Sequence, residues 1–262
     1  MTFVAVALAA LAVSLLTLFS GFGLGTLLLP VFAIFFPVPV AIGATAIVHL
    51  ANNLFKAGLV GRAADWRVVR RFAPPAAAAA IGGALVLRAI SSAAPIASYT
   101  LGGRVCEITP VKLVIAALML AFAAFELHPR FRAVTFGEGH LVAGGLLSGF
   151  FGGLSGHQGA LRSVFLLKSG LTPSALVGTG AACAIAVDVS RLVVYGPAFF
   201  TKDFAVLGEP TGRALVWTAA AAAFVGTFTG TRLVKKVSLR AMQVLAGVLL
   251  IVIAAGLAAG VI

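Results

Sequence analysis

Eight long apolar segments, separated by short polar or proline-containing stretches, run through almost the whole of this 262-residue chain. A helix needs about 20 apolar residues to cross the hydrocarbon core of a bilayer, whereas a barrel strand needs about 10 of alternating polarity. The segments therefore predict an all-α polytopic membrane protein, and no linker is long enough for a second domain. The segments are approximately Phe3–Phe36, Val40–Leu59, Phe72–Ile90, Val111–Leu127, His140–Leu167, Ser174–Tyr195, Arg213–Thr231 and Arg240–Ile262.

The charge content supports lipid as the surrounding solvent. Only 10% of the residues are charged, against roughly 25% in an ordinary soluble domain. The 19 Lys and Arg outnumber the 7 Asp and Glu, which gives a net charge of +12. The basic residues lie mostly between apolar runs, as in cytoplasmic loops, and not on a solvated face as in nucleic-acid binders. We therefore expect the lipid bilayer, and no nucleic acid, as a partner.

The first and fifth segments are interrupted by glycine-rich, polar stretches. The first reads Ser20-Gly-Phe-Gly-Leu-Gly-Thr26, and the fifth reads Gly152-Gly-Leu-Ser-Gly-His-Gln-Gly159. A broken backbone inside a bilayer is tolerated only where protein or a water-filled cavity satisfies its polar groups. Paired breaks in corresponding halves of a chain indicate a transporter binding site. Simple packing kinks are the alternative interpretation.

The two breaks belong to an internal duplication. A shift of 134 residues (159 − 25) pairs five identical residues in the same order. The chain is thus expected to be a single transporter domain, 1–262, with repeat 1 at about 1–128 and repeat 2 at about 139–262. The pairs are Gly25 with Gly159, Leu27 with Leu161, Pro39 with Pro173, Ala41 with Ala175, and Thr45 with Thr179.

The loop charges predict the topology. The basic stretches 61–71 and 232–240 both have the character of cytoplasmic loops. They lie on the same side only if the fifth segment is a re-entrant hairpin. Each repeat would then contain one Gly-interrupted, re-entrant helical hairpin plus three transmembrane helices, and the two repeats would be inverted relative to each other. Eight simple crossings are the competing topology. The row Gly145, Gly149 and Gly153 predicts close helix packing.

Several of these motifs resemble the sulfite exporter TauE/SafE family. They are Ser20-Gly-Phe-Gly-Leu-Gly-Thr-Leu-Leu-Leu-Pro30, then Ala44-Thr45 and Asn52-Asn53-Leu-Phe-Lys56, and in the second half Gly152–Gly159 leading to Pro173 and Thr179. The resemblance implies a permease of the bacterial inner (cytoplasmic) membrane that moves small sulfur-containing anions such as sulfite, sulfonates or sulfoacetate. His157, Gln158 and Arg162 make the second motif more polar than the family's glycine-rich version, which leaves the particular substrate open.

An anion in a membrane needs hydrogen-bond donors and positive potential in place of its water shell. Helix N-termini supply both, and the arms that follow the two breaks begin near Gly25 and Gln158. Ionisable residues inside apolar spans add to this, and His is the side chain that titrates near neutral pH. The predicted substrate-binding residues are Ser20, Gly21, Gly23, Gly25, Thr26, Asn52, Asn53, Lys56, Ser155, Gly156, His157, Gln158, Gly159 and Arg162, and the candidates for proton coupling are His49, His157 and Asp188.

Plainer roles are available for some of these residues. Lys56 and Arg162 could extend to the membrane interface. Asp188 and Arg191, three residues apart, are expected to form a structural ion pair near the outer end of their span. The aromatic residues near span ends are expected to form interfacial belts; they are Trp66, Tyr195 and Trp217.

Other chemistries have little support in the sequence. The spacing of His, Cys and Asp predicts no metal site, and no cofactor is expected. An intramembrane enzyme would need more than Ser155 and His157, because no third residue is evident to orient the base. A membrane scaffold or assembly protein without transport is the other alternative, and it predicts no polar lining at the breaks. The exact anion, the direction of transport and the oligomeric state stay open.

Overall fold

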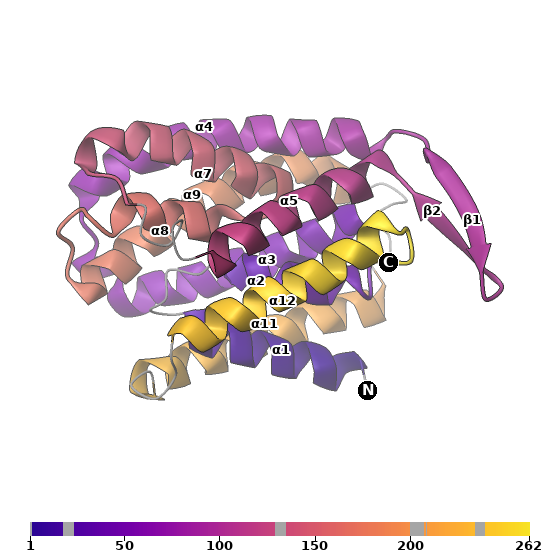
Figure 1. The fold of residues 1–262 in the computed structure, drawn as a ribbon. Coiled ribbons are helices and arrows are strands. Elements are labelled where there is room, and N and C mark those ends of the chain that lie inside the picture. Colours follow the sequence, from indigo (N-terminus) through magenta and orange to yellow (C-terminus); the bar gives the residue numbers. More distant parts are fainter. Residues whose placement is uncertain (1, 18–23, 129–134, 200–206, 208, 234–238) are drawn as a thin grey trace.

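The computed structural model describes residues 2–17, 24–128, 135–199, 207, 209–233 and 239–262, and these residues form a bundle of helices that pack side by side (Figure 1). The α-helices are α1 (Thr2–Thr17), α2 (Leu24–Ala33), α3 (Val38–Val60), α4 (Trp66–Ser91), α5 (Pro110–Leu127), α7 (Leu141–Ser155), α8 (Gln158–Leu166), α9 (Pro173–Phe199), α11 (Pro210–Leu233) and α12 (Leu239–Ala258). Two short 3-10 helices, η1 (Gly61–Ala63) and η2 (Glu138–His140), precede α4 and α7.

The apolar segments of the sequence correspond to these helices, which confirms a mostly helical architecture. Four helices in the described part of the chain are long and apolar enough to cross a membrane, namely α3 (with η1), α4, α5 and α9. Large apolar side chains face outward from the bundle, including Leu85, Trp217 and Val252, each at least half exposed. A surface of this kind suits lipid better than water.

One end of the bundle collects the basic loops. The amide of Asp65, before α4, donates to Thr179 near the start of α9 at 2.9 Å, and Arg67 pairs with Glu138 before α7 at 2.9 Å. Arg240, at the start of α12, donates to the carbonyl of Leu127 at the end of α5 at 3.3 Å. We call this the basic end. It carries Arg62, Arg67, Arg70, Arg71, Lys168 and Arg240.

The opposite end carries a β-hairpin that the sequence analysis treated only as a polar linker. Strands β1 (Ala97–Leu101) and β2 (Arg104–Ile108) pair antiparallel and project from the bundle beside the C-terminus (Figure 1). Gly102 and Gly103 form the turn with φ of 57° and 79°, a backbone conformation that L side chains rarely adopt. Tyr99 donates to the carbonyl of Ala259 at 2.5 Å, which fixes the hairpin to the end of α12. We call this the hairpin end.

Helices α7 and α8 fold back on each other. The amide of Phe136, ahead of α7, donates to the carbonyl of Val164 near the end of α8 at 3.1 Å. A Cβ on Gly144, in the first turn of α7, would lie 2.4 Å from the ring of Phe165. The entry and the exit of this helical hairpin are therefore neighbours, and both lie at the basic end.

Glycines set the contact between α4 and α7. A Cβ on Gly149 would lie 2.0 Å from the carbonyl oxygen of Ala76, and one on Gly153 would lie 2.0 Å from that of Ala80. From the other side, a Cβ on Gly83 would meet the carbonyl oxygen of Phe150 at 2.0 Å. Only glycine permits this backbone contact, and the small-residue row of α7 thus has the packing role that its spacing predicts.

Candidate functional site

The break between α7 and α8 lies inside the protein. Helix α7 ends at Ser155, and Gly156 follows with φ of 80° as a left-handed C-cap; glycine accepts this conformation without the steric cost of a Cβ. His157 and Gln158 then start α8, and all four of these residues are buried. The polar backbone of the break therefore has to find its partners within the protein.

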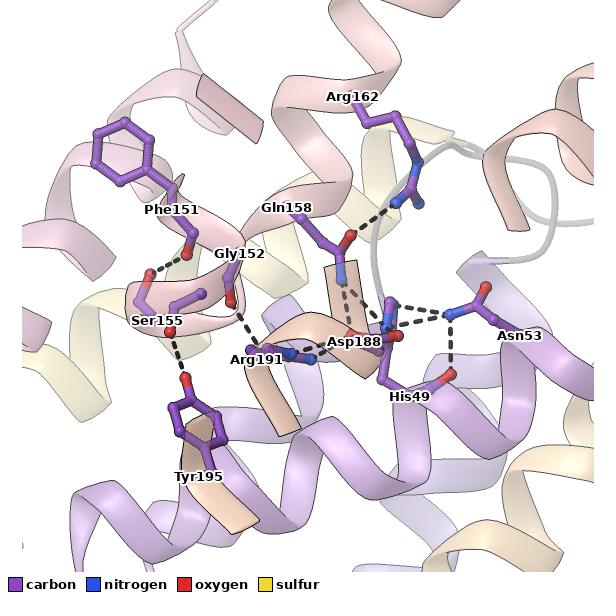
Figure 2. Close-up of polar contacts among 11 residues, drawn as sticks. His49, Asn53, Phe151, Gly152, Ser155, Gln158, Arg162, Asp188, Arg191 and Tyr195 are labelled. Atoms are coloured by element: carbon purple, nitrogen blue, oxygen red, sulfur yellow. Dashed lines mark hydrogen bonds and ion pairs between the residues drawn. The ribbon is translucent and has the colours of Figure 1, made fainter. Parts of the chain in front are cut away.

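Side chains of α9 supply those partners (Figure 2). The guanidinium of Arg191 donates from Nη1 to the carbonyl of Gly152 at 3.1 Å, and the hydroxyl of Tyr195 donates to the carbonyl of Gly153. A cation at a helix C-terminus also complements the negative end of the helix dipole. The ion pair that the sequence predicts between Asp188 and Arg191 is present, at 2.7 Å, and Arg191 is fully buried. Tyr195 is 5% exposed, so the prediction that it belongs to an interfacial belt is wrong.

Asp188 is the centre of a buried polar network that joins α3, α8 and α9. Its Oδ1 accepts from Arg191 Nη2 at 2.7 Å and from Gln158 Nε2 at 2.9 Å. Its Oδ2 lies 2.6 Å from Nδ1 of His49. Asn53 donates to the carbonyl of His49 at 2.8 Å and lies 3.1 Å from its Nδ1. The acid and the imidazole that the sequence proposed for proton coupling are thus in direct contact.

Two further cations are buried beside this network. Lys56 and Arg162 are each 8% exposed, and each lies within the electrostatic field of the other. Arg162 donates from Nη1 to Oε1 of Gln158 at 3.2 Å. In the described part of the chain, no carboxylate lies within ion-pair distance of either cation. Both side chains are thus mostly enclosed by the bundle.

The first break meets the second. A Cβ on Gly25, at the start of α2, would lie 2.9 Å from the carbonyl oxygen of Gly156 and 3.7 Å from the methyl of Thr45. Helices α2 and α8 begin 134 residues apart (158 − 24), the same shift that aligns the two glycine motifs. The chain thus brings the two interruptions together, although residues 18–23 lie outside the described residues.

Several buried polar atoms around this meeting point have no hydrogen-bond partner among the described residues. They are Oγ1 of Thr26, Oγ1 of Thr45, Nδ2 of Asn52 and Nε2 of His157. Hydroxyl, amide and one tautomer of imidazole can all donate. Buried polar groups normally have partners, and those that lack one in a native protein commonly mark a site for a ligand or water.

The structure brings together most of the predicted site residues. Gly25, Thr26, Gly156 and Gly159 lie at the two helix starts or their turn, and Asn52, Asn53 and Lys56 lie on one face of α3. Ser155 contacts His157 at 3.0 Å, but its hydroxyl also lies 3.1 Å from the carbonyl of Phe151, and the imidazole stacks on Phe122. The predicted Ser20, Gly21 and Gly23 lie outside the described residues.

Sequence reasoning did not assign a site role to three residues that border this region. Thr45 belonged only to the repeat alignment, where its pairing with Thr179 was the available signal. Ser14 and Thr227 hold the side chain of Asn52: Thr227 donates to its Oδ1 at 2.7 Å, and Ser14 lies 2.6 Å from Thr227. No sequence signal linked α1 and α11 to Asn52, because these residues are far apart in the chain.

The chain also matches a known protein family. The family model described as Sulfite exporter TauE/SafE matches residues 6–257. The chain belongs to the sulfite exporter TauE/SafE family. The family resemblance first seen in the glycine motifs is thereby confirmed, and it extends over nearly the whole chain. This TauE/SafE protein is a transmembrane permease of a family of transporters for sulfur anions. The chain has no match among the curated proteins or the solved structures with which it was compared.

Proposed function

We propose that this TauE/SafE protein is a permease of the bacterial inner membrane that binds sulfite or an organosulfonate between Lys56, Arg162 and the start of α8. The single observation that carries the proposal is the pair of buried cations without a carboxylate partner in the described chain. The charge of Arg191 is offset by Asp188, which leaves the two charges of Lys56 and Arg162 uncompensated. Buried charges are costly unless they are paired, and an anionic substrate supplies the missing partner.

The donors around the cations suit an oxyanion. The first turn of α8 offers backbone N–H groups without intrahelical partners, and its N-cap residue, His157, makes no side-chain cap. Nδ2 of Asn52, four residues before Lys56 on α3, is a buried donor that has no partner in the part of the chain that the structure describes. The oxygen atoms of an oxyanion can accept hydrogen bonds from several such donors at once, whereas a cation would be repelled.

Alternating access follows from the opposite entry of the two helical hairpins. We infer that α7 and α8 form a re-entrant hairpin from the basic end, and that α1 and α2 form the corresponding hairpin from the hairpin end, where the N-terminus lies (Figure 1). Each hairpin plus three helices then makes one repeat of a single domain, 1–262, and the repeats are inverted. Inverted repeats that meet at a central site permit exchange between inward-open and outward-open forms.

The same geometry gives less support to the two alternative functions, a scaffold and an intramembrane enzyme. A scaffold without transport predicts an apolar interior at the breaks, whereas Asp188, Arg191 and Gln158 are fully buried there. An intramembrane hydrolase needs a third group that orients His157, and the described residues within hydrogen-bond reach of its ring nitrogens include only Ser155.

The proposal is tested by anion flux in proteoliposomes that contain the purified protein, with sulfite, thiosulfate and ethanesulfonate as competing anions. Lys56→Met and Arg162→Met each remove one cation and are expected to reduce flux roughly ten- to hundredfold, because a hydrogen bond to a charged group contributes about 1.5–3 kcal/mol. Lys168→Met, which removes an exposed lysine at the basic end, is the matched control and should retain wild-type flux.

Absence of flux with all three anions in the wild-type protein would refute the proposed function. Wild-type flux in both Lys56→Met and Arg162→Met would instead refute this placement of the anion.

A further inference from the structure

The side-chain amide of Gln158 joins the acid–imidazole pair to one of the two unpaired cations (Figure 2). Its Nε2 donates to Oδ1 of Asp188 at 2.9 Å, and its Oε1 accepts from Nη1 of Arg162 at 3.2 Å. Gln158 itself is fully buried. These two contacts fix the orientation of the amide, because the rotated amide would place its oxygen against a carboxylate and its NH₂ group against a guanidinium.

The imidazole of His49 lies within reach of the same amide. Its Nδ1 is 2.6 Å from Oδ2 of Asp188 and 3.5 Å from Nε2 of Gln158. The short contact with a carboxylate requires a hydrogen on Nδ1, so Nε2 is the ring nitrogen that takes up a proton. The only other polar group near Nε2 in the described residues is Nδ2 of Asn53, at 3.4 Å.

Protonation of His49 would weaken the hydrogen bond from Gln158 to Asp188. A positive charge would then lie about 3.5 Å from Nε2 of the amide, whose hydrogens carry partial positive charge, and the same charge would partly neutralise Asp188. Both effects favour rotation of the amide away from Asp188. Rotation removes Oε1 from Arg162 and frees a guanidinium N–H for another acceptor.

We propose that Gln158 is a positioning residue that transmits the protonation of the His49–Asp188 pair to Arg162, so that a proton and the anion bind together. The inference rests on the proposed function, since it takes Lys56 and Arg162 as the anion site. One proton is added at Nε2 of His49 from the aqueous side to which the site is open, and it leaves with the anion on the other side. The coupled species is therefore a proton and a small sulfur anion moving in the same direction.

The groups that face His49 are compatible with this scheme. Asp188 and Arg191 approach from α9, Arg162 acts from α8, and Asn53 and Lys56 lie on its own helix α3. The cations disfavour a protonated imidazole, and Asp188 favours it. An incoming anion beside Arg162 offsets the cations, which makes proton binding and anion binding mutually favourable.

The experiment is ethanesulfonate uptake into proteoliposomes at pH values between about 5.5 and 8, because the charge of a sulfonate is constant across the range in which imidazole titrates. In the wild-type protein the KM is expected to fall with decreasing pH, by up to about tenfold per pH unit for one coupled proton. Gln158→Met keeps the side-chain length but removes the amide. We expect its KM to be raised and nearly independent of pH.

Two further variants make the comparison specific. His49→Asn removes the titrating group and should also abolish the pH dependence. Gln243→Met removes another buried glutamine amide, on α12, and should retain the wild-type slope. If Gln158→Met does not elute as a monodisperse protein, Gln158→Asn, one methylene shorter, replaces it, since it is too short to span both partners.

The outcomes separate the two proposals. A wild-type pH slope in a folded Gln158 variant would overturn the role of Gln158, because the proton would then act on the anion through space. A KM independent of pH in the wild-type protein would overturn the coupling but leave the anion site in place. Loss of all anion flux in the wild-type protein, with sulfite, thiosulfate and ethanesulfonate alike, would overturn both.

Discussion

At the residue scale, the buried cations of this protein have opposite roles. Arg191 donates to the carboxylate of Asp188 and to the carbonyl of Gly152, so its positive charge has acceptor partners within the protein. Lys56 and Arg162 share no carboxylate in the described chain. Removal of one partner of a buried pair leaves the other charge without compensation and is destabilising, whereas a buried cation without a carboxylate partner itself costs stability.

Replacement of Arg191 should therefore destabilise the protein. Arg191→Met leaves the buried carboxylate of Asp188 short of its main partner, and removal of one member of a buried pair costs about 3–5 kcal/mol. The measurement is the thermal unfolding transition in detergent. Arg88→Met, an exposed arginine on α4, serves as the control and should change stability by less than about 0.5 kcal/mol.

Replacement of Lys56 should have the reverse effect. Lys56→Met exchanges a mostly buried lysine, which has no carboxylate partner in the described chain, for an apolar side chain of similar length. It is expected to leave the unfolding temperature equal or higher while anion flux falls. A substantially lower unfolding temperature would contradict this, since it would show that Lys56 has a structural partner.

At the element scale, the contact of α4 with α7 depends on glycine at individual positions. Gly82 and Gly83 are adjacent on α4, yet their surroundings differ. A Cβ at Gly83 would overlap the backbone of α7, whereas one at Gly82 would meet no atom within 4 Å. The α7–α8 hairpin is held against α4 by this interface, and so is the break that starts α8.

These neighbouring glycines provide a matched pair of variants. Gly83→Ala should destabilise the protein by about 1–3 kcal/mol, because the helices must separate. Gly82→Ala should be neutral or stabilise it by up to about 1 kcal/mol through helix propensity. Thermal unfolding of both variants checks the difference, and equal values would mean that α4 and α7 are not packed this closely.

At the scale of the whole molecule, the two ends of the bundle differ in charge and structure. The basic end carries the loops around Arg62, Lys168 and Arg240, and the hairpin end carries β1 and β2. Basic loops are retained in the cytoplasm. The basic end is therefore expected to be cytoplasmic, and the β-hairpin to lie on the other side of the membrane.

Cysteine accessibility tests this orientation. In a background in which the buried Cys106 and Cys183 are replaced by Ser, Lys168→Cys should react with an impermeant maleimide only from the cytoplasmic side. Thr100→Cys, at an exposed position of β1, should react only from the opposite side. Reaction of Lys168→Cys from outside would contradict the re-entrant hairpin, because eight simple crossings place that loop there.

Features that depend on local composition could be predicted from the sequence. The apolar segments predicted the helices, and the glycine-rich stretch predicted the break at Gly156. Helices α2 and α8 start 134 residues apart, which is the shift that aligns the two glycine motifs. The β-hairpin was missed although Gly102-Gly103 between two short runs is a hairpin signal. Apolar length, the signal that marks the membrane segments, carries no information about a short hairpin between two of them.

The pairing of buried charges on different helices was decided by tertiary structure alone. His49 and Asp188 are 139 residues apart, whereas Asp188 and Arg191 lie three residues apart on one helix, and their predicted ion pair is present. Hydropathy reports whether a residue is in an apolar segment, and it carries no information about which side chains of different helices face one another. The sequence therefore determined where the chain is helical and where it breaks, while the packing of α3, α8 and α9 decided which buried charges are compensated and which are left for a ligand.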